Sequence, residues 1–151
     1  MYTQDSEDLQ DINLVSEPSL GYGAVSTNSQ YYLINHINHG ISYHSFAVLQ
    51  EFAPFSVSEW SSYLHLTERT LLRYKTENKI FENIYAEKII ELSKVINKGK
   101  DTFSDISTFS KWLSAPSISL GGYKPKDLLV TSIGISLVHD ELVRIDYGVL
   151  A

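Results

Sequence analysis

The chain has 151 residues, of which 43% are apolar and none is cysteine. This composition allows a packed core in one domain or two small ones. The absence of cysteine excludes both a disulfide framework and a thiolate metal site. No apolar run approaches the ~18 residues that a membrane-spanning helix needs. The net charge of −6 and the acidic first residues, which are unlike a signal peptide, lead us to expect a soluble cytoplasmic protein with weak non-specific affinity for DNA.

Charge is distributed unevenly along the chain. Residues 1–39 carry five acids and no Lys or Arg, residues 40–100 carry eight bases and seven acids, and residues 101–151 carry four bases and six acids. Attraction to phosphate depends on the local density of Lys and Arg, so any DNA-binding surface should lie in the middle segment. With so small an excess of positive charge, we expect DNA binding to need an oligomer that pairs several basic helices.

The beginning of the chain has the composition of a mobile segment. Residues 1 to about 30 are rich in Asp, Glu, Ser, Gln and Asn and have little periodicity. The short apolar run 31–34 then either adds a strand or packs on the next helix, and both alternatives stay open.

Capping residues predict the first two helices. Ser42 can cap a helix that Pro54 ends, because Ser accepts hydrogen bonds from the first free N–H groups and Pro cannot continue the helix. Ser56 and Glu59 have the spacing of a capping box, which predicts a second helix running to Leu64.

Thr67 can cap a third helix that reaches about Lys75 and turns Leu71 and Leu72 toward the core. Two short helices joined by a tight turn fit a helix-turn-helix, in which the second helix enters the major groove of DNA. Arginine pairs with guanine or phosphate, and hydroxyl groups reach phosphate. The candidate DNA-binding residues are Thr67, Arg69, Thr70, Arg73 and Tyr74. The alternative is that these side chains form only the solvated face of an ordinary helix.

Apolar spacing and turn residues predict the remaining elements. A longer fourth helix should end at Gly99, and Asp105 should cap a fifth helix that ends at Pro116. Residues 117–126 should form a turn-rich loop, after which residues 126–133 resume helical spacing. Gly134 marks a helix boundary or a close backbone contact before a last helix. The residues expected to face the core in that helix are Val138, Leu142 and Ile145, and Trp60 and Trp112 are expected core anchors.

Neither a metal site nor a catalytic site is indicated. His36, His39 and His44 lack the further ligands of a zinc site, with Glu51 as the nearest carboxylate. A nucleophile elbow, a phosphate-binding glycine loop and a paired-carboxylate signature are missing from the sequence. We therefore expect no catalytic residue, no metal and no cofactor.

The end of the chain, residues 147–151, has a flexible joint at Gly148 and apolar side chains. It is either a frayed terminus or a short plug that inserts into a partner's cleft. Composition does not distinguish a frayed terminus from a plug.

Residues 106–151 resemble the toxin-binding domain of Xre/MbcA/ParS-type antitoxins, which belong to bacterial type II toxin–antitoxin systems. The pattern consists of Phe109, Trp112, Leu113, Pro116, Leu120, Gly121, Gly122, Pro125, Asp127, Leu128, Leu129, Thr131, Gly134, Val138, Leu142, Ile145 and Gly148. Upstream, residues 43–103 resemble the Xre-type helix-turn-helix of the same family. This part of the likeness rests on Phe55, Leu64, Thr67, Leu71, Ile90 and Phe103.

The resemblance implies an all-α protein with an acidic segment 1–39, an Xre-like helix-turn-helix domain 40–104 and a toxin-binding domain 105–151. It implies an antitoxin that covers the active site of a RES-domain, NAD-consuming toxin and represses its own operon, as a homodimer or a larger assembly with the toxin. The implied toxin-binding residues are Leu120, Gly121, Gly122, Arg144, Tyr147, Gly148, Val149 and Leu150. The alternative is a stand-alone transcription regulator whose carboxy-terminal domain dimerises it.

Overall fold

The computed structural model describes residues 27–148, so residues 1–26 and 149–151 lie outside the described part of the chain. Val149 and Leu150, two of the predicted toxin-binding residues, therefore lie outside the described residues. The same holds for the greater part of the segment predicted to be mobile.

The fold is all-α, as predicted, with a single small antiparallel pair of strands among the described residues. The strand pair joins Ile41 to Phe81 and Ser42 to Ile80. The elements in chain order are α3 (Thr27–His39), β1 (Ile41–Ser42), α4 (Tyr43–Phe52), α5 (Val57–Leu64), α6 (Glu68–Glu77), β2 (Ile80–Phe81), α7 (Asn83–Thr102), α8 (Ile106–Ser114), the 3-10 turn η1 (Ile118–Leu120), α9 (Pro125–Leu128) and α10 (Ser132–Asp146).

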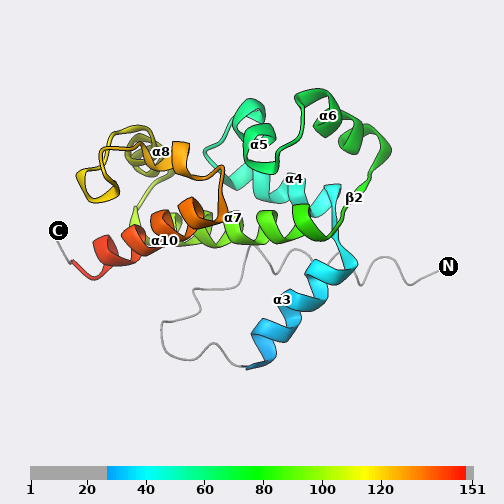
Figure 1. Ribbon diagram of the computed structural model, residues 1–151, viewed down its shortest axis with the longest axis horizontal. Helices are drawn as coiled ribbons and strands as arrows, with labels where there is room; N and C mark the ends of the chain where they lie inside the picture. Colours follow the sequence, from blue (N-terminus) through cyan, green and yellow to red (C-terminus); the bar gives the residue numbers. More distant parts are fainter. Residues whose placement is uncertain (1–26, 149–151) are drawn as a thin grey trace.

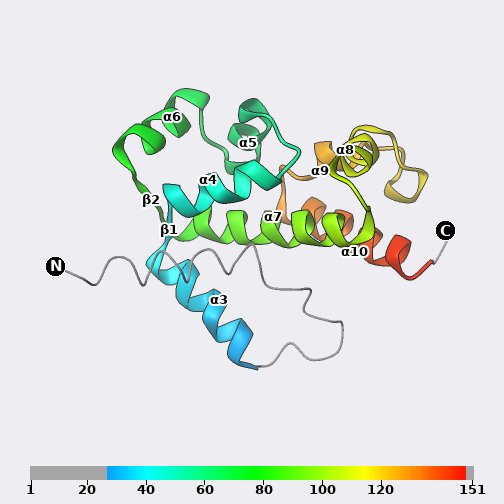
Figure 2. The ribbon, with the colours of Figure 1, turned by 180° about the vertical axis from the view of Figure 1, so that it is seen from behind.

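Helix α7 is the central element, and the other helices are arranged around it (Figures 1 and 2). Helices α4, α5 and α6 lie along one side of α7, and α3 lies on the other side. Helix α10 runs beside the second half of α7, with which it makes its main contact. Helix α6 and the loop after α8 therefore lie at opposite ends of the long axis of the molecule.

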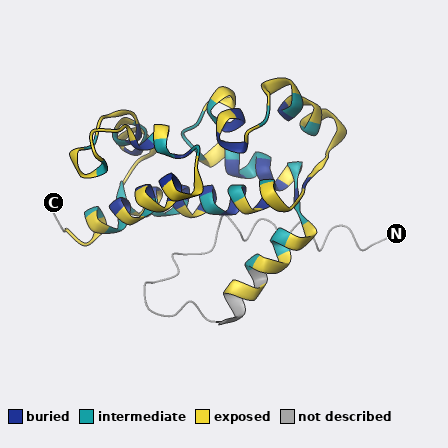
Figure 3. Ribbon diagram, viewed as in Figure 1, coloured by how far each residue is buried: buried dark blue, intermediate teal, exposed yellow. Residues whose placement is uncertain are grey.

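One continuous core joins these helices. At one end, the Phe46 ring meets the rings of Trp60 and Phe81 edge to face, with centroids 5.0 Å apart in both pairs. At the other end, Phe109 and Leu142 are fully buried on α8 and α10. The buried residues of α7 face both groups, whereas the outer surfaces of the helices are exposed (Figure 3).

The predicted caps are confirmed. The Ser42 and Thr67 hydroxyls accept the expected N–H bonds at the starts of α4 and α6, and Asp105 does so for α8. Ser56 and Glu59 form both hydrogen bonds of a capping box. Trp60 is buried, and Trp112 is half-buried against Phe103 and Phe109, so both tryptophans pack in the core as predicted.

The start of the described chain differs from the prediction. Residues 27–39 form helix α3 in place of an irregular segment, and the apolar run 31–34 lies within this helix. Leu33 and Ile37, one helical turn apart, pack against the core. The sequence signal was weak because α3 carries few apolar residues on its core-facing side.

Gly99 does not end the fourth helix. Helix α7 continues to Thr102, and Gly99 is buried inside it. A Cβ atom at Gly99 would overlap the ring of Phe109. The glycine is therefore needed for close packing of α8 on α7, and the prediction mistook it for a helix terminator.

The helix predicted for residues 126–133 is also wrong. Helix α9 ends at Leu128, and Thr131 caps a new helix, α10, by accepting from the N–H of Gly134. Both expectations for Gly134 are confirmed, because it lies in the first turn of α10 and a Cβ atom there would overlap the carbonyl oxygen of Leu128. A new helix starts here because the Thr131 side chain caps it, and the absence of a side chain at Gly134 lets the Leu128 carbonyl lie close to its first turn.

Candidate functional site

Helices α5 and α6 are joined by the turn at residues 65–67. His65 ends α5 in the left-handed conformation with a φ of 54°. Thr67 then starts α6 by accepting from the N–H of Thr70, and the two threonine hydroxyls are 2.9 Å apart. The turn therefore has one residue that closes α5, one connecting residue and one residue that caps α6.

The outward face of α6 carries part of the predicted DNA-binding set. Arg69 and Arg73 are exposed and lie one helical turn apart, so their guanidinium groups extend from the same face. Thr67 is exposed and Thr70 is half-buried, and their hydroxyls bond to each other.

Tyr74 has a packing role that the sequence did not predict. Its ring stacks on that of Phe81 with centroids 4.7 Å apart, and the ammonium group of Lys79 lies 5.8 Å from the ring centroid. The half-buried Tyr74 thus anchors α6 to the strand pair.

Leu72 lies outward, contrary to the prediction that it faces the core. Its side chain is 59% exposed, whereas Leu71 is buried. Adjacent residues on a helix point about 100° apart, so a helix that packs along one narrow side cannot bury both. Leu72 joins Arg69 and Arg73 on the outward face, and this residue was missed because an apolar side chain was assigned to the core.

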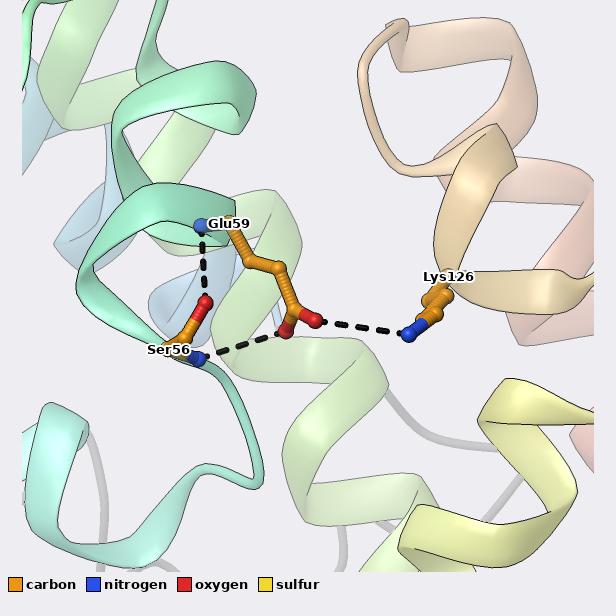
Figure 4. A network of polar contacts seen from close by, with 3 residues as sticks. All are labelled: Ser56, Glu59 and Lys126. Carbon is orange, nitrogen blue, oxygen red and sulfur yellow. Dashed lines mark hydrogen bonds and ion pairs between the residues drawn. The ribbon is translucent and has the colours of Figure 1, made fainter.

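The α5–α6 pair is attached to the last third of the chain. Glu59 accepts from the backbone N–H of Ser56 and also forms an ion pair with Lys126 of α9, with Nζ and Oε1 3.5 Å apart (Figure 4). The side chains of His65 and Lys88 both reach the carbonyl oxygen of Val130, at 2.9 and 3.3 Å. These contacts join residues 42 to 67 positions apart, so no local pattern could have predicted them.

The predicted loop of the last third is a closed turn. The N–H of Ser117 donates to the carbonyl of Tyr123, and the N–H of Gly122 donates back to the carbonyl of Ser117. Gly121 and Gly122 have positive φ values of 71° and 84°, which glycine adopts without strain. Leu120 is half-buried and packs on the core, whereas Ile118 is 97% exposed. Leu120 therefore anchors the loop, whereas Ile118, which was not predicted, and Tyr123 are exposed on it.

Helix α10 has a buried face and an exposed stripe. Ile135, Val138 and Leu142 are buried toward the core. The stripe on the opposite side combines apolar and charged residues at helical spacing. Its members are Ile133, Leu137, Asp140, Arg144 and, at the helix end, Tyr147.

Two members of this stripe, Arg144 and Tyr147, belong to the predicted toxin-binding set, and Ile133 and Leu137 do not. Arg144 pairs with the buried carboxylate of Glu141, with the two charged atoms 3.0 Å apart. Gly148 follows the helix with a positive φ of 67°. Ile133 and Leu137 were missed, although their spacing of four residues, out of phase with the core positions, could have found them.

Two titratable groups in this half of the molecule have displaced pKa values. Burial lowers the pKa of His139 on α10, and the nearby ammonium groups of Lys98 and Lys94 lower it further, against the opposing effect of Asp140. Burial raises the pKa of Tyr63 on α5, and the carboxylates of Glu59 and Asp127 add to the increase.

Residues 98–148 match the family model described as the antitoxin Xre/MbcA/ParS C-terminal toxin-binding domain. This segment, from the end of α7 to the residue after Tyr147, is therefore similar to that family, as its sequence pattern predicted. The matched segment contains the closed loop and the whole of α10. No curated protein matches the chain. No helix within residues 27–148 is long and apolar enough to cross a membrane.

Proposed function

We propose that this protein is an antitoxin that binds a RES-type, NAD-consuming toxin and covers its active site. The family match of residues 98–148 supports the antitoxin role. The RES type of the toxin follows from the sequence resemblance. Residues 40–104 and 105–151 are proposed to act as the DNA-binding and toxin-binding parts.

The exposed stripe of α10 is the observation that carries the proposal. Ile133 is 77% exposed and Leu137 is 48% exposed, and both lie within the matched segment. A few well-packed side chains near the centre of an interface supply most of its binding energy, and the surrounding contacts exclude water. The stripe has this composition, with Asp140 and Arg144 beyond the apolar pair.

The experiment measures inhibition of the toxin encoded by the neighbouring gene. Ile133→Glu and Leu137→Glu should each raise the antitoxin concentration needed to stop NAD consumption by about tenfold or more, because a buried charge opposes binding. Val57→Glu is the matched control, since Val57 is an exposed apolar residue on α5. The stripe is not the toxin interface if all three variants inhibit equally well.

The residues after α10 are proposed to form a plug that enters the toxin's cleft, with Gly148 supplying the bend. A chain that ends at Asp146 should keep its helical content and lose much of its inhibition. If its inhibition equals that of the full chain, the plug is not needed and α10 with the loop does the binding.

We further propose that the protein represses its own operon through α5 and α6. Arg69 and Arg73 would contact phosphates or guanine. Helix α6 and the loop after α8 lie at opposite ends of the molecule, so DNA and toxin could be bound together (Figure 1).

Operator binding tests this second activity. Arg73→Ala should weaken binding to the protein's own promoter by ~1–3 kcal/mol if the arginine reads a base. The same variant should inhibit the toxin normally, and Lys111→Ala on α8 is the charge-matched control. Absence of promoter binding at moderate salt would exclude autoregulation. A chain that binds the promoter but not the neighbouring gene's product would be a stand-alone regulator.

A further inference from the structure

Helix α6 carries one apolar side chain on its outward face. Leu72 is 59% exposed, and Arg69 and Arg73 lie beside it on the same face at helical spacing. Leu71 is buried and the Tyr74 ring packs against the strand pair, so the helix cannot turn to bury Leu72 as well. The packing of Leu71 and Tyr74 therefore holds Leu72 in solvent.

The two arginines beside Leu72 have no counter-charge on the described part of the protein. Within residues 27–148, neither Arg69 nor Arg73 forms an ion pair. Glu77, four residues after Arg73, pairs instead with Lys79, with Oε2 and Nζ 3.2 Å apart. Like charges one helical turn apart disfavour a helix unless an anion lies near them. This face is therefore suited to DNA, whose phosphates supply the negative charge.

The rest of the outward surface of α6 is polar, so Leu72 does not belong to a larger apolar patch on this helix. The other exposed residues of α6 are Glu68, Arg69, Arg73, Lys75, Thr76 and Glu77. A protein interface has a cluster of packed side chains at its centre, which a single leucine among charges does not provide. The partner of Leu72 is therefore expected to be one small apolar group within a polyanion.

Duplex DNA offers such a group in its major groove. The base edges there present hydrogen-bond donors and acceptors, and their only apolar group is the C5 methyl of thymine. The second helix of a helix-turn-helix enters this groove. Helix α6 has 10 residues and is about 15 Å long, with Leu72 near its middle. Leu72 therefore matches the thymine methyl group in chemistry and in position.

We propose that Leu72 is a specificity-determining residue that recognises a thymine of the operator through its C5 methyl group. Arg69 and Arg73 hold α6 on phosphates or guanine, and Leu72 selects one thymine·adenine pair. This inference rests on the proposed DNA binding by α5 and α6, and it names the base that the helix selects. Burial of one methyl group corresponds to about a fourfold change in affinity.

Replacing thymine by uracil tests the contact, because this change removes only the methyl group. The full chain should bind its own promoter about fourfold more weakly when the fragment contains deoxyuridine in place of thymidine. Leu72→Ala should bind both fragments with equal affinity. Ile118→Ala is the matched control and should keep the native preference, because Ile118 is an exposed isoleucine outside α5 and α6. Urea unfolding checks the fold of each variant.

Selection of binding sites from randomised duplexes locates the base without knowledge of the operator. The native chain should enrich thymine at a defined position of the site. Leu72→Ala should leave that position random and enrich the remaining positions as the native chain does. Retention of the thymine by Leu72→Ala would assign its recognition to another residue.

Two further outcomes would overturn the role of Leu72 while leaving DNA binding in place. One is equal weakening of the native chain and Leu72→Ala by deoxyuridine, which would mean that the methyl groups act through the shape of the duplex. The other is an unchanged affinity of the native chain for the deoxyuridine fragment. A chain that binds neither fragment and enriches no sequence would exclude the proposed DNA binding itself, and this inference with it. Toxin inhibition is measured separately, so the antitoxin proposal stays intact in each case.

Discussion

The imidazole Nε2 of His65 lies 2.9 Å from the carbonyl oxygen of Val130, although 65 residues separate the two in the sequence. His65 closes α5, and Val130 lies in the short link between α9 and α10. The Lys88 ammonium of α7 donates to the same oxygen, so His65 fastens the α5–α6 turn, and Lys88 fastens α7, to the segment matched by the toxin-binding family. The proposed DNA-binding and toxin-binding parts are therefore in direct polar contact.

Removing these two donors should destabilise the fold in a non-additive way. His65→Asn suits the left-handed backbone but is too short to reach Val130, and Lys88→Met keeps the side-chain stem. Each change should lower the free energy of unfolding by about 0.5–1 kcal/mol, as measured by urea titration. In the double variant, the loss of stability should exceed the sum of the two single losses, because the half-buried Val130 carbonyl then has neither donor.

His44→Asn is the control for the histidine change, because His44 is exposed on α4. Strict additivity of the His65 and Lys88 effects would show that water replaces the lost donors at Val130.

Gly99→Ala should destabilise the protein by about 1–3 kcal/mol, since the added methyl group would overlap the buried Phe109 ring. This sign is opposite to the usual effect of replacing a helical glycine by alanine. Urea unfolding measures the loss, and Glu87→Ala on the exposed side of α7 should change stability by less than about 0.5 kcal/mol.

A second substitution tests the cause of that loss. In a Phe109→Leu background the smaller side chain leaves room for a Cβ atom, so Gly99→Ala should cost much less. An equal cost in both backgrounds would mean that the Phe109 ring is not what the methyl group meets.

His139 should make the protein less stable as the solution becomes acidic. The folded state lowers the pKa of His139, so the unfolded chain takes up a proton first as pH falls through its ordinary value of 6.5. Stability should therefore decline from about pH 6.5 down to the lower pKa of the folded state, and this contribution should change no further below that value.

Thermal unfolding of His139→Gln over the same pH range measures this contribution, because glutamine does not titrate. The variant should lose less stability than the native protein on acidification. Parallel pH profiles for the native and His139→Gln proteins would contradict the assignment.

Much of the fold was predictable because its signals are local. Ser42, Ser56, Thr67 and Asp105 each begin a helix where the sequence predicts one, since a capping hydroxyl or carboxylate needs only an N–H group two or three residues away. The wrong predictions share a different cause. Gly99 and Leu72 were assigned by residue type, but their roles depend on whether another element packs against that side of the helix.

The residues of the candidate surfaces were also predicted only in part. Arg69 and Arg73 were found from the sequence, because polar residues on a short capped helix indicate an outward face. Ile133 and Leu137 were missed, although their spacing, out of phase with the expected core positions Val138 and Leu142, indicates the opposite side of the helix.

The amino-acid sequence by itself determined where most helices begin and which family the last third resembles, because caps, periodicity and an ordered motif act over a few residues each. Only the tertiary structure decided that the α5–α6 turn meets Val130, that α3 turns Tyr31 outward, and that Phe109 needs a glycine beside it. Such contacts depend on how distant helices pack against one another in three dimensions. The spacing of residues along the chain does not encode this packing.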